Sequence, residues 1–326
     1  LNFKIGDRVV TNGSHSEFVC VPHMLCAKIP DAVSYEEAVF TVIGSIGLQG
    51  IRLAKPELGE KFLVVGLGLV GLITAQLLIA NGCKVYGIDP NKNKCNIANK
   101  FGIETYNSPN LEEQINWCYT NTNGVGMDGI LITAETNSNG PIDLAAQSSR
   151  KKGRIISIGA VGLQLKRDYF YKKELQFQVS CSYGPGRYDP SYEENGNDYP
   201  IGYVRWTQKR NFDAILQALE TKSLKIKDLI SHKFDINNAI DAYKLLTSNE
   251  EQLAILIEYP FVEDIREDTI YLDKKPITNK DKNNIGFIGA GNFARNVLIP
   301  NFSKLNANLY SIVSNSGIGP ASLGKK

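Results

Sequence analysis

The sequence lacks a concentration of charge of either sign. Its 326 residues include 36 Lys and Arg against 34 Asp and Glu, which gives a formal net charge of +2. The densest basic cluster, residues 150–154, is typical of a solvated helix end. Because a nucleic-acid-binding protein needs a clustered basic face, we expect no nucleic-acid partner.

Paired cysteines and a signal peptide are also missing. The six cysteines are scattered, and several lie in apolar or helical stretches, as reduced thiols of cytosolic proteins do. We therefore expect a cytoplasmic protein. The chain starts at Leu1, inside a β-like segment and without an initiator Met, so we also expect it to be part of a longer protein.

One hydrophobic stretch, residues 62–80, is nearly free of polar side chains, with only Thr74 and Gln76. Its length would suit a membrane span. Three glycines near its start, and Asn81-Gly82 followed by a β-rich segment, argue against that interpretation. We expect no membrane span.

The same stretch contains the glycine turn Gly66-x-Gly68-x-x-Gly71, between a predicted strand at 62–65 and a predicted helix at 69–80. Gly66 permits the tight turn, Gly68 lets the backbone approach a pyrophosphate, and Gly71 lets the helix pack closely on the strand. The helix N-terminus offers free N–H groups and a positive dipole end. The pattern predicts the first βαβ unit of a dinucleotide site.

Asp89 follows the next predicted strand, residues 84–88. A carboxylate about 20 residues after the glycines is the usual partner of a ribose hydroxyl, although Asp before Pro90 also suits a simple turn. A carboxylate there would repel a 2′-phosphate, so the predicted cofactor is NAD. The nearby Lys92 and Lys94 keep NADP as an alternative.

Residues 41–183 alternate between predicted strands and helices, which favours an α/β fold with a doubly wound parallel sheet. The other strands are predicted at 129–133, 154–158 and 175–181, and the plainest other helices at 111–121 and 141–150. Ligands bind at the carboxyl ends of such strands. The predicted cofactor-binding residues are therefore Gly66, Gly68, Leu69, Val70, Gly71, Asp89, Lys94, Thr133, Ala134, Ile158, Gly159 and Ala160.

The flanking segments differ in pattern. Residues 3–10 and 17–22 alternate like strands around a turn at Asn12-Gly13, which predicts a hairpin. Residues 184–260 start with an aromatic, glycine-rich loop and continue with predicted helices at 211–220 and 236–246 and a strand at 253–258.

The last part of the chain contains a second predicted strand followed by a glycine turn. Residues 261–283 are charged and suit a linker. Residues 284–326 then enter a second glycine turn, Gly289-x-Gly291-x-x-Ala294, followed by a predicted helix and a strand at 309–313. Ser314-Asn315 follows that strand in place of a carboxylate, so we predict a truncated second Rossmann domain that is not a working site.

With these motifs in place, residues 1–260 resemble the medium-chain dehydrogenase/reductase family, the fold of the zinc alcohol and polyol dehydrogenases. The matching stretches, in order, are 3–10, 21–22, 28–31, 66–71 and 153–159. The resemblance implies a partial β-rich GroES-like catalytic domain at 1–40 and an NAD-binding Rossmann domain at 41–183. It also implies a substrate loop and a return to the catalytic domain at 184–260.

Residues 284–326 resemble the opening of a glucose–fructose oxidoreductase-like domain, a family that acts largely on sugars and polyols. The two domains in this order are similar to bidomain oxidoreductases associated with bacterial surface-polysaccharide synthesis. Residues 183–190 and 199–206 look characteristic of that subgroup.

Zinc members of the family hold a catalytic metal with a cysteine near the start of the cofactor domain, and Ser45 stands at that position here. A serine hydroxyl is not ionised near neutral pH and is a poor Zn²⁺ ligand. The cysteine lobe of the structural zinc is also absent, so we expect no zinc. Cys20-x-x-His23-x-x-Cys26 is a local alternative metal site, against ordinary packing of these residues.

The catalytic residue stays unassigned, because no Ser/His/Asp or Cys/His pattern points to covalent chemistry. His15 and His232 are expected at the surface or in hydrogen bonds. Side chains able to bind phosphate or sugar hydroxyls gather in the loop after the last strand. The candidate substrate-binding residues are Ser45, Tyr183, Arg187, Tyr188 and Arg205, with a loop packed by its own aromatics as the alternative.

The sequence therefore favours an NAD-dependent oxidoreductase acting on a hydroxyl or carbonyl of a sugar, polyol or nucleotide-sugar, without catalytic zinc. The alternatives are a zinc-type alcohol, polyol or threonine dehydrogenase, and a non-catalytic cofactor-binding scaffold. A predicted edge strand at 175–180 suggests a homodimer.

Overall fold

The computed structural model describes residues 3–248, 250–260, 282–305, 307–314, 320 and 323. Its contacts divide the chain into two compact units, Leu1–Pro260 and Phe261–Lys326. In the described part of the chain, no helix has the length and apolar character needed to cross a membrane.

A six-stranded sheet lies at the centre of the first unit, and all its neighbouring strands run parallel. The strand order is β5-β4-β3-β6-β7-β8, so the order reverses between β3 and β6. This is the doubly wound sheet that the strand–helix alternation predicts, and ligands of such sheets bind at a reversal of this kind. The strands are β3 (Lys61–Val65), β4 (Lys84–Ile88), β5 (Glu104–Tyr106), β6 (Met127–Ile132), β7 (Ser149–Ser157) and β8 (Gln176–Val179).

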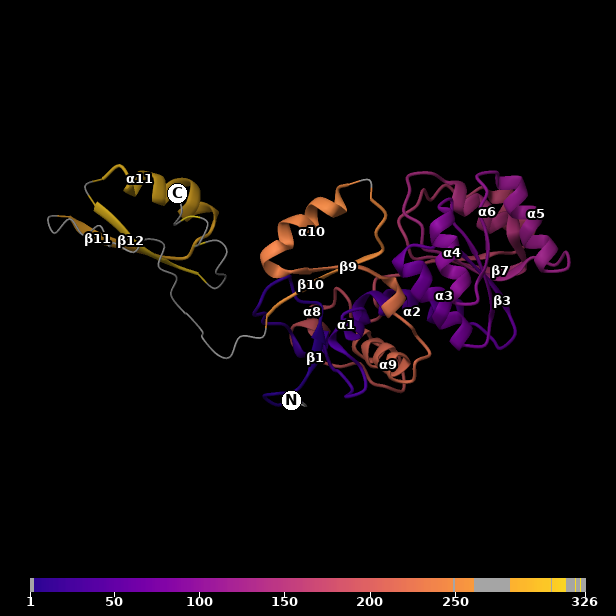
Figure 1. Cartoon of the computed structure of the whole chain (residues 1–326), viewed down its shortest axis with the longest axis horizontal. Helices are drawn as coiled ribbons and strands as arrows, with labels where there is room; N and C mark the ends of the chain where they lie inside the picture. The colour runs from indigo at the N-terminus through magenta and orange to yellow at the C-terminus, as the bar shows by residue number, and fades with distance from the viewer. Residues whose placement is uncertain are drawn as a thin grey trace. The chain divides into compact units, whose positions relative to one another are not determined.

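Helices cover both faces of this sheet (Figure 1). Phe62 and Val64 point to a core shared with α2 (Thr41–Ala54), α3 (Leu69–Ala80) and α4 (Lys92–Lys100). Leu63 and Val65 point to the opposite core, against α5 (Leu111–Asn121) and α6 (Gly140–Ser148). Since both faces are buried at the centre of the sheet, the strands β3, β4 and β6 are mostly apolar and do not alternate regularly with polar residues.

The N-terminal hairpin prediction is wrong in its second strand, and of the first predicted strand, residues 3–10, only Val9 and Val10 lie in a strand. β1 (Val9–Thr11) pairs antiparallel with β2 (Cys26–Lys28), and residues 17–22, all of them described, form no strand. Pairing with β2 buries Ala27 in the core, whereas Phe18 and Val19 stay exposed. Alternation therefore produces a strand only where a buried face receives the apolar side chains. A short 3₁₀ turn, η1 (His23–Leu25), precedes β2.

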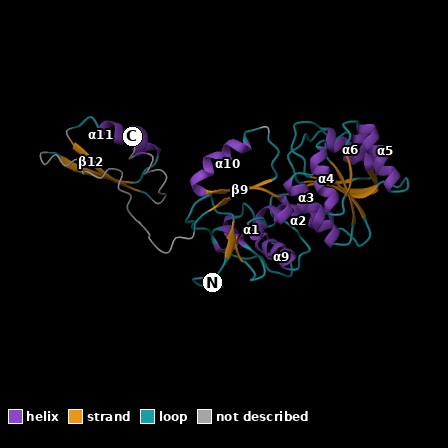
Figure 2. Cartoon of the chain, in the orientation of Figure 1, coloured by secondary structure: helices purple, strands orange, loops and turns teal. Residues whose placement is uncertain are grey.

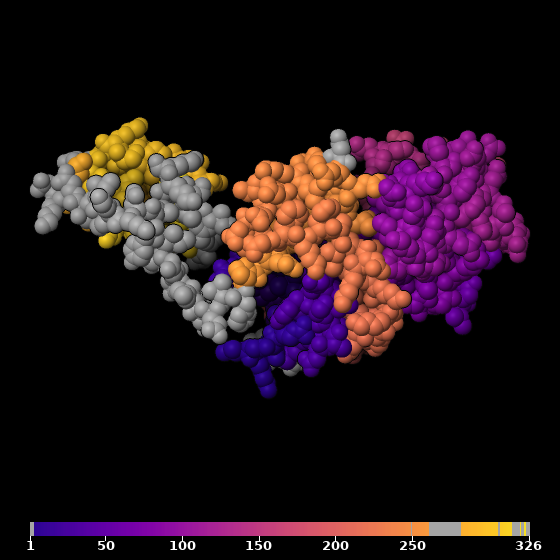
Figure 3. All heavy atoms as spheres, viewed as in Figure 1, coloured from indigo at the N-terminus to yellow at the C-terminus, as the bar shows by residue number. Residues whose placement is uncertain are grey.

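The segment after β8 returns to the N-terminal residues. Apart from α7 (Arg167–Tyr171) and α8 (Pro190–Glu193), the connections around β8 are mostly loop. α9 (Gln208–Glu220) buries Phe212, Ile215, Leu216 and Leu219 along one face and contacts α1 (Tyr35–Ala38), α2 and β2. Figure 3 shows the N-terminal residues in indigo beside the orange segment of residues 208–258.

A small parallel pair completes the first unit: β9 (Ile230–Asp235) and β10 (Ala254–Glu258), joined through α10 (Ala239–Leu246) (Figure 2). Two short 3₁₀ turns, η2 (Lys227–Leu229) and η3 (Ile236–Asn238), flank β9. The predicted helix at 236–246 is thus a 3₁₀ turn followed by an α-helix.

The second unit contains a strand–helix–strand motif. β11 (Asn283–Ile288) pairs parallel with β12 (Ala307–Val313), and a π-helical turn, Ala294–Leu298, leads into α11 (Ile299–Phe302) between them. The predicted strand–turn–helix–strand order is found here. The linker prediction falls almost wholly outside the described residues, as does Asn315.

Candidate functional site

Two glycines of the first turn are required by the fold itself. Gly66 has a φ of +95°, and a Cβ there would lie 2.7 Å from the backbone nitrogen of Ala134. A Cβ on Gly71 would lie 2.0 Å from the carbonyl oxygen of Gly66. Any side chain at either position would force the strand, the turn and α3 apart.

The third glycine has no such structural reason. Gly68 has a φ of −68°, which any residue adopts, and a Cβ there would meet no protein atom within 4 Å. It is the N-cap of α3, where no side chain accepts a hydrogen bond from the first turn. The N–H groups of that turn therefore lack a side-chain cap and lie at the positive end of the helix dipole, which suits an anion.

Asp89 lies beside this turn and is 5% exposed. Its Oδ2 accepts a hydrogen bond from the backbone N–H of Leu67 at 2.7 Å, and its Oδ1 accepts one from Asn91 N–H at 2.7 Å. These bonds fix the carboxylate at the C-terminal end of β4. Each oxygen retains a further lone pair, so a ribose hydroxyl could still donate to it.

The carboxyl ends of β6 and β7 converge on the same turn. The Thr133 hydroxyl donates to the Gly66 carbonyl at 2.6 Å. A Cβ on Gly159 would lie 2.1 Å from the carbonyl oxygen of Ala134, so the two strand ends meet closely. Ile158 packs on Gly50 of α2, and Ala160 accepts from Thr136 N–H. The structure thus gathers the predicted glycines, Asp89 and these strand ends at one edge.

Lys94 lies in the first turn of α4, close in sequence to Asp89. The side chain of Asn91 caps this helix and accepts the N–H groups of Asn93 and Lys94 at 2.8 and 3.2 Å. Leu69 and Val70 form the first turn of α3 and are half-buried, so their contribution to a ligand would come from their backbone.

Ser45 does not lie at a ligand-accessible surface, which corrects its place among the candidate substrate residues. Its side chain is fully buried in α2, and its hydroxyl donates to the Thr41 carbonyl at 2.8 Å. A hydroxyl engaged in this way is a poor fit for zinc. In the described ranges, no three His, Cys, Asp or Glu side chains come together as a possible metal site.

The Cys20, His23 and Cys26 pattern does not form a cluster either. Cys20 is exposed and Cys26 is buried, and burial raises the pKa of the Cys26 thiol. Lys209 Nζ donates to the carbonyls of His23 and Cys26 at 3.2 and 2.7 Å, which indicates a packing role.

The two remaining histidines also have ordinary surroundings. His15 Nδ1 lies 3.1 Å from the Tyr243 hydroxyl, and the ring of His232 stacks on Phe234. The contact of His15 agrees with the expected hydrogen bond, whereas His232 is half-buried and its Nδ1 is buried without a hydrogen-bond partner among the described residues.

In the loop after β8, several polar side chains form hydrogen bonds or ion pairs with other residues of the protein. Tyr183 is 5% exposed, and its hydroxyl accepts a hydrogen bond from Asn12 Nδ2 at 2.8 Å. The Arg187 guanidinium donates to both carboxylate oxygens of Glu193 at 3.0 Å and stacks on Tyr188. Tyr188 and Arg205 are the two candidate substrate residues whose side chains are exposed.

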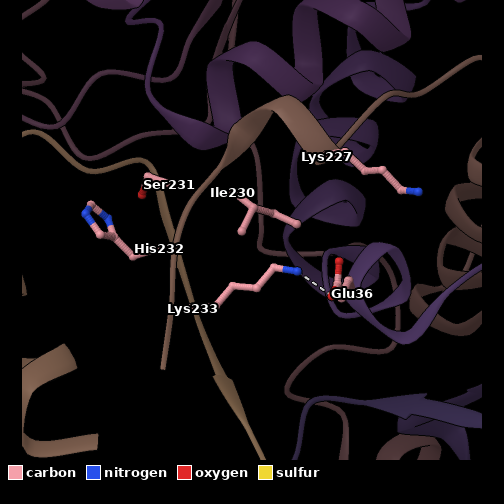
Figure 4. Close-up of a pocket in the computed structure, with 6 residues that line it drawn as sticks. All are labelled: Glu36, Lys227, Ile230, Ser231, His232 and Lys233. Carbon is pink, nitrogen blue, oxygen red and sulfur yellow. Dashed lines mark hydrogen bonds and ion pairs between the residues drawn. The ribbon is translucent and has the colours of Figure 1, made fainter. Parts of the chain in front are cut away.

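A separate cavity of about 370 Å³ lies elsewhere in the first unit (Figure 4). Figure 4 shows Lys233 pointing toward Glu36, with which it forms an ion pair, while Lys227 points away. No predicted cofactor or substrate residue lines this cavity, whose lining is Glu36, Lys227, Ile230, Ser231, His232 and Lys233.

Known proteins are similar to this chain in sequence and in fold. Residues 70–194 match the family model of the zinc-binding dehydrogenases. D-guloside 3-dehydrogenase of Escherichia coli (strain K12) is 27% identical over 271 residues, which cover 80% of this chain and 72% of the relative. D-xylulose reductase of Saccharomyces cerevisiae is 24% identical over 222 residues, covering 67% of this chain and 56% of the relative.

Solved structures agree on the fold. Galactitol-1-phosphate dehydrogenase from Escherichia coli superimposes with a TM-score of 0.62 at 19% identity, covering 74% of this chain and 66% of that one. A short chain alcohol dehydrogenase (rspB) from E. coli CFT073, complexed with NADH, gives a TM-score of 0.58 at 20% identity and covers 74% and 64%. The chain thus spans less than two thirds of the length of these solved structures.

The relatives named here are dehydrogenases or reductases, which supports a dehydrogenase acting on CH–OH groups. The likeness of residues 284–326 to a glucose–fructose oxidoreductase-like domain, and the link to surface polysaccharides, stay predictions. In sequence and fold, the chain is similar to zinc-type, alcohol dehydrogenase-like medium-chain dehydrogenases, and the family model of the zinc-binding dehydrogenases matches residues 70–194.

Proposed function

We propose that the chain binds NAD at the first glycine turn, and that the protein transfers a hydride between nicotinamide and a CH–OH or carbonyl group of a sugar-like substrate. The observation that carries this proposal is Gly68: neither its backbone angles nor its protein neighbours require a glycine. An anionic ligand on the uncapped N-terminus of α3 supplies the missing reason.

The other residues around the turn have complementary roles in this proposal. The first turn of α3 binds the pyrophosphate, and Asp89 accepts hydrogen bonds from the ribose hydroxyls. Thr133, Ala134 and Gly159 line the crevice where the strand order reverses, which is where the rest of a dinucleotide lies. The bound nicotinamide supplies the hydride chemistry.

A sugar, polyol or nucleotide-sugar is the proposed substrate class. The names of the relatives support it, since they refer to a guloside, to xylulose and to sorbitol. We propose that Arg205 and Tyr188, the exposed candidates of the loop after β8, contact this substrate. We also propose a cytoplasmic homodimer joined through β8, which lies at one edge of the sheet and exposes 56% of Val179.

We further propose that no zinc takes part in the reaction. The buried hydroxyl of Ser45, bonded to its own helix, supports this view. The zinc-type alternative is motivated by the description of the matching family model. Metal analysis of the purified full-length protein separates the two, because stoichiometric zinc would contradict our assignment of Ser45.

The cofactor site is tested by calorimetric titration of NAD and NADP into the wild type and the variant Gly68→Val. We expect the wild type to bind NAD, and the variant to lose at least about tenfold in affinity because the new side chain occupies the phosphate position. The free energy of unfolding should fall by no more than about 1 kcal/mol, the cost of a poorer N-cap.

Gly202→Val is the matched control, since a Cβ on Gly202 also meets no protein atom within 4 Å. This variant should bind NAD like the wild type. Unchanged NAD affinity in Gly68→Val contradicts the proposed site, and so does a failure of the full-length protein to bind either cofactor.

A further inference from the structure

A carboxylate from the distant C-terminal part of the first unit lies against the start of α4. Glu251 precedes β10 and is exposed. Its Oε1 accepts a hydrogen bond from Asn91 Nδ2 at 2.9 Å, and its Oε2 accepts one from Asn93 Nδ2 at 2.5 Å. Two side-chain amides therefore fix the direction of this carboxylate.

Asn91 links Glu251 to the ribose-binding candidate Asp89. Its backbone N–H donates to Asp89 Oδ1 at 2.7 Å, while its side-chain amide donates to Glu251. One residue of the β4–α4 loop thus holds two carboxylates, Asp89 at the end of β4 and Glu251 just before β10. Asn107 holds the same loop by donating to the carbonyls of Asp89 and Pro90 at 2.8 and 2.7 Å.

This loop is the place where NAD and NADP differ. In dinucleotide-binding sheets, the residues after the second strand contact the 2′ position of the adenosine ribose, and a cation accommodates the 2′-phosphate of NADP. Lys92 and Lys94 are the nearby cations in this chain, and Lys94 is the one whose charge acts on Glu251. Hydrogen bonds from Asn91 and Asn93, assisted by the charge of Lys94, lower the pKa of Glu251, so its carboxylate is ionised at neutral pH and offsets that charge.

We propose that Glu251 is a specificity residue that makes the site prefer NAD over NADP. Its carboxylate, held at the start of α4, repels a 2′-phosphate and offsets the charge that Lys94 would contribute. This inference rests on the proposed cofactor site. It adds a determinant that lies outside the glycine–aspartate fingerprint and 160 positions after Asn91.

The test is a charge series at position 251, Glu251→Gln and Glu251→Lys, with NAD and NADP affinities measured by titration calorimetry at low ionic strength. The ratio of the NADP to the NAD dissociation constant should fall about three- to tenfold at each step, because each step removes about one unit of repulsion. NAD affinity should stay within about twofold, and added salt should shrink the effect on the ratio.

Glu174→Gln is the matched control. Glu174 is exposed and pairs with Lys152 at 3.5 Å, but it lies just before β8, at the opposite edge of the sheet. Its ratio should equal that of the wild type. A ratio that stays constant through the series while NAD still binds overturns the inference alone, as does an equal change for both cofactors. If the wild type binds neither cofactor, the proposed function and this inference fail together.

Discussion

Gly68 and Gly71 lie three residues apart in one motif, and glycine is needed at each for a different reason. At Gly71 the fold excludes a side chain, because a Cβ would lie 2.0 Å from the Gly66 carbonyl oxygen. At Gly68 only an added ligand would exclude one. The spacing of the motif predicts both glycines but cannot separate the two reasons, since that requires the position of every neighbouring atom.

Local and distant residues of the site differ in how well the sequence predicts them. The glycine turn and Asp89 belong to one βαβ unit, so their spacing alone places them together. Glu251 reaches the same loop through the fold of the chain, and no sequence spacing signals that contact. The family resemblance predicts Ser45 at the site, yet the packing of α2 buries this residue.

The buried thiols give a prediction for single residues. Burial raises the pKa of Cys83 and of Cys118 to about 11, so both stay protonated and unreactive at pH 8. We expect a thiol-specific disulfide reagent at pH 8 to modify two thiols rapidly. The rapid pair should be the exposed Cys20 and Cys181, and the slow group Cys26, Cys83, Cys95 and Cys118.

The raised pKa of Cys118 also determines how the free energy of unfolding depends on pH. Because the folded pKa of Cys118 lies above the ordinary value of 9.0, its stabilising contribution is complete below pH 9 and is lost as the pH rises toward 11.

In the thiol-modification experiment, the double variant Cys20→Ser/Cys181→Ser, followed by mass spectrometry, should lose the rapid phase. A third rapidly modified thiol would contradict the assignment.

At the scale of elements, α2 has a weak sequence signal for a helix, yet it packs against α3, α9 and the sheet. Its glycines face three different neighbours: Gly44 faces Ile215 of α9, Gly47 faces Thr74 of α3, and Gly50 faces Ile158. Three glycines weaken the local preference for a helix. Tertiary packing against α3, α9 and the sheet therefore decides its formation, and no local pattern predicts its bounds.

Gly47→Ala tests this close packing. A Cβ at Gly47 would lie 2.3 Å from the Thr74 hydroxyl oxygen, which is fully buried and donates to the Val70 carbonyl. Urea unfolding should show a loss of about 1–3 kcal/mol from overpacking, although alanine gains about 1 kcal/mol of helix propensity over glycine.

A second comparison removes the Thr74 hydroxyl, which a Cβ at Gly47 would meet. In a Thr74→Ala background, Gly47→Ala should cost less than in the wild type, because the oxygen that it meets is absent. Gly202→Ala, at an open loop position, should change stability by no more than about 0.5 kcal/mol. Equal costs of Gly47→Ala in both backgrounds would show that the two helices do not meet there as described.

The elements that were predicted well share one physical property. The strands β3, β4 and β6 and the helix α3 are mostly apolar runs bounded by turn residues, and α5 begins after the N-cap Asn110. β5 has three residues and α4 is mostly polar, so neither was predicted. The wrong strand at 17–22 had the period but no buried face to pack on.

At the scale of the whole molecule, burial is concentrated in the first unit. Every buried hydrophobic side chain in the described ranges belongs to residues 10–254, and most of them form two cores that include the two faces of the sheet. β10 belongs to this unit, since Ala254 is 6% exposed and Leu253 and Leu256 pack on the first core. The free energy of burial that stabilises the sheet therefore comes from residues up to Pro260.

This distribution predicts that a chain ending at Pro260 unfolds like the full chain. Its unfolding midpoint in urea and its NAD affinity should match those of the 326-residue chain, because the proposed site and both cores lie before that point. A chain ending at Ser248 is the contrasting control. It removes β10 and Glu251, so it should lose stability through the unpaired β9 and, where NAD still binds, should discriminate less against NADP. A large loss of stability on truncation at Pro260 would show that the first unit depends on residues beyond it.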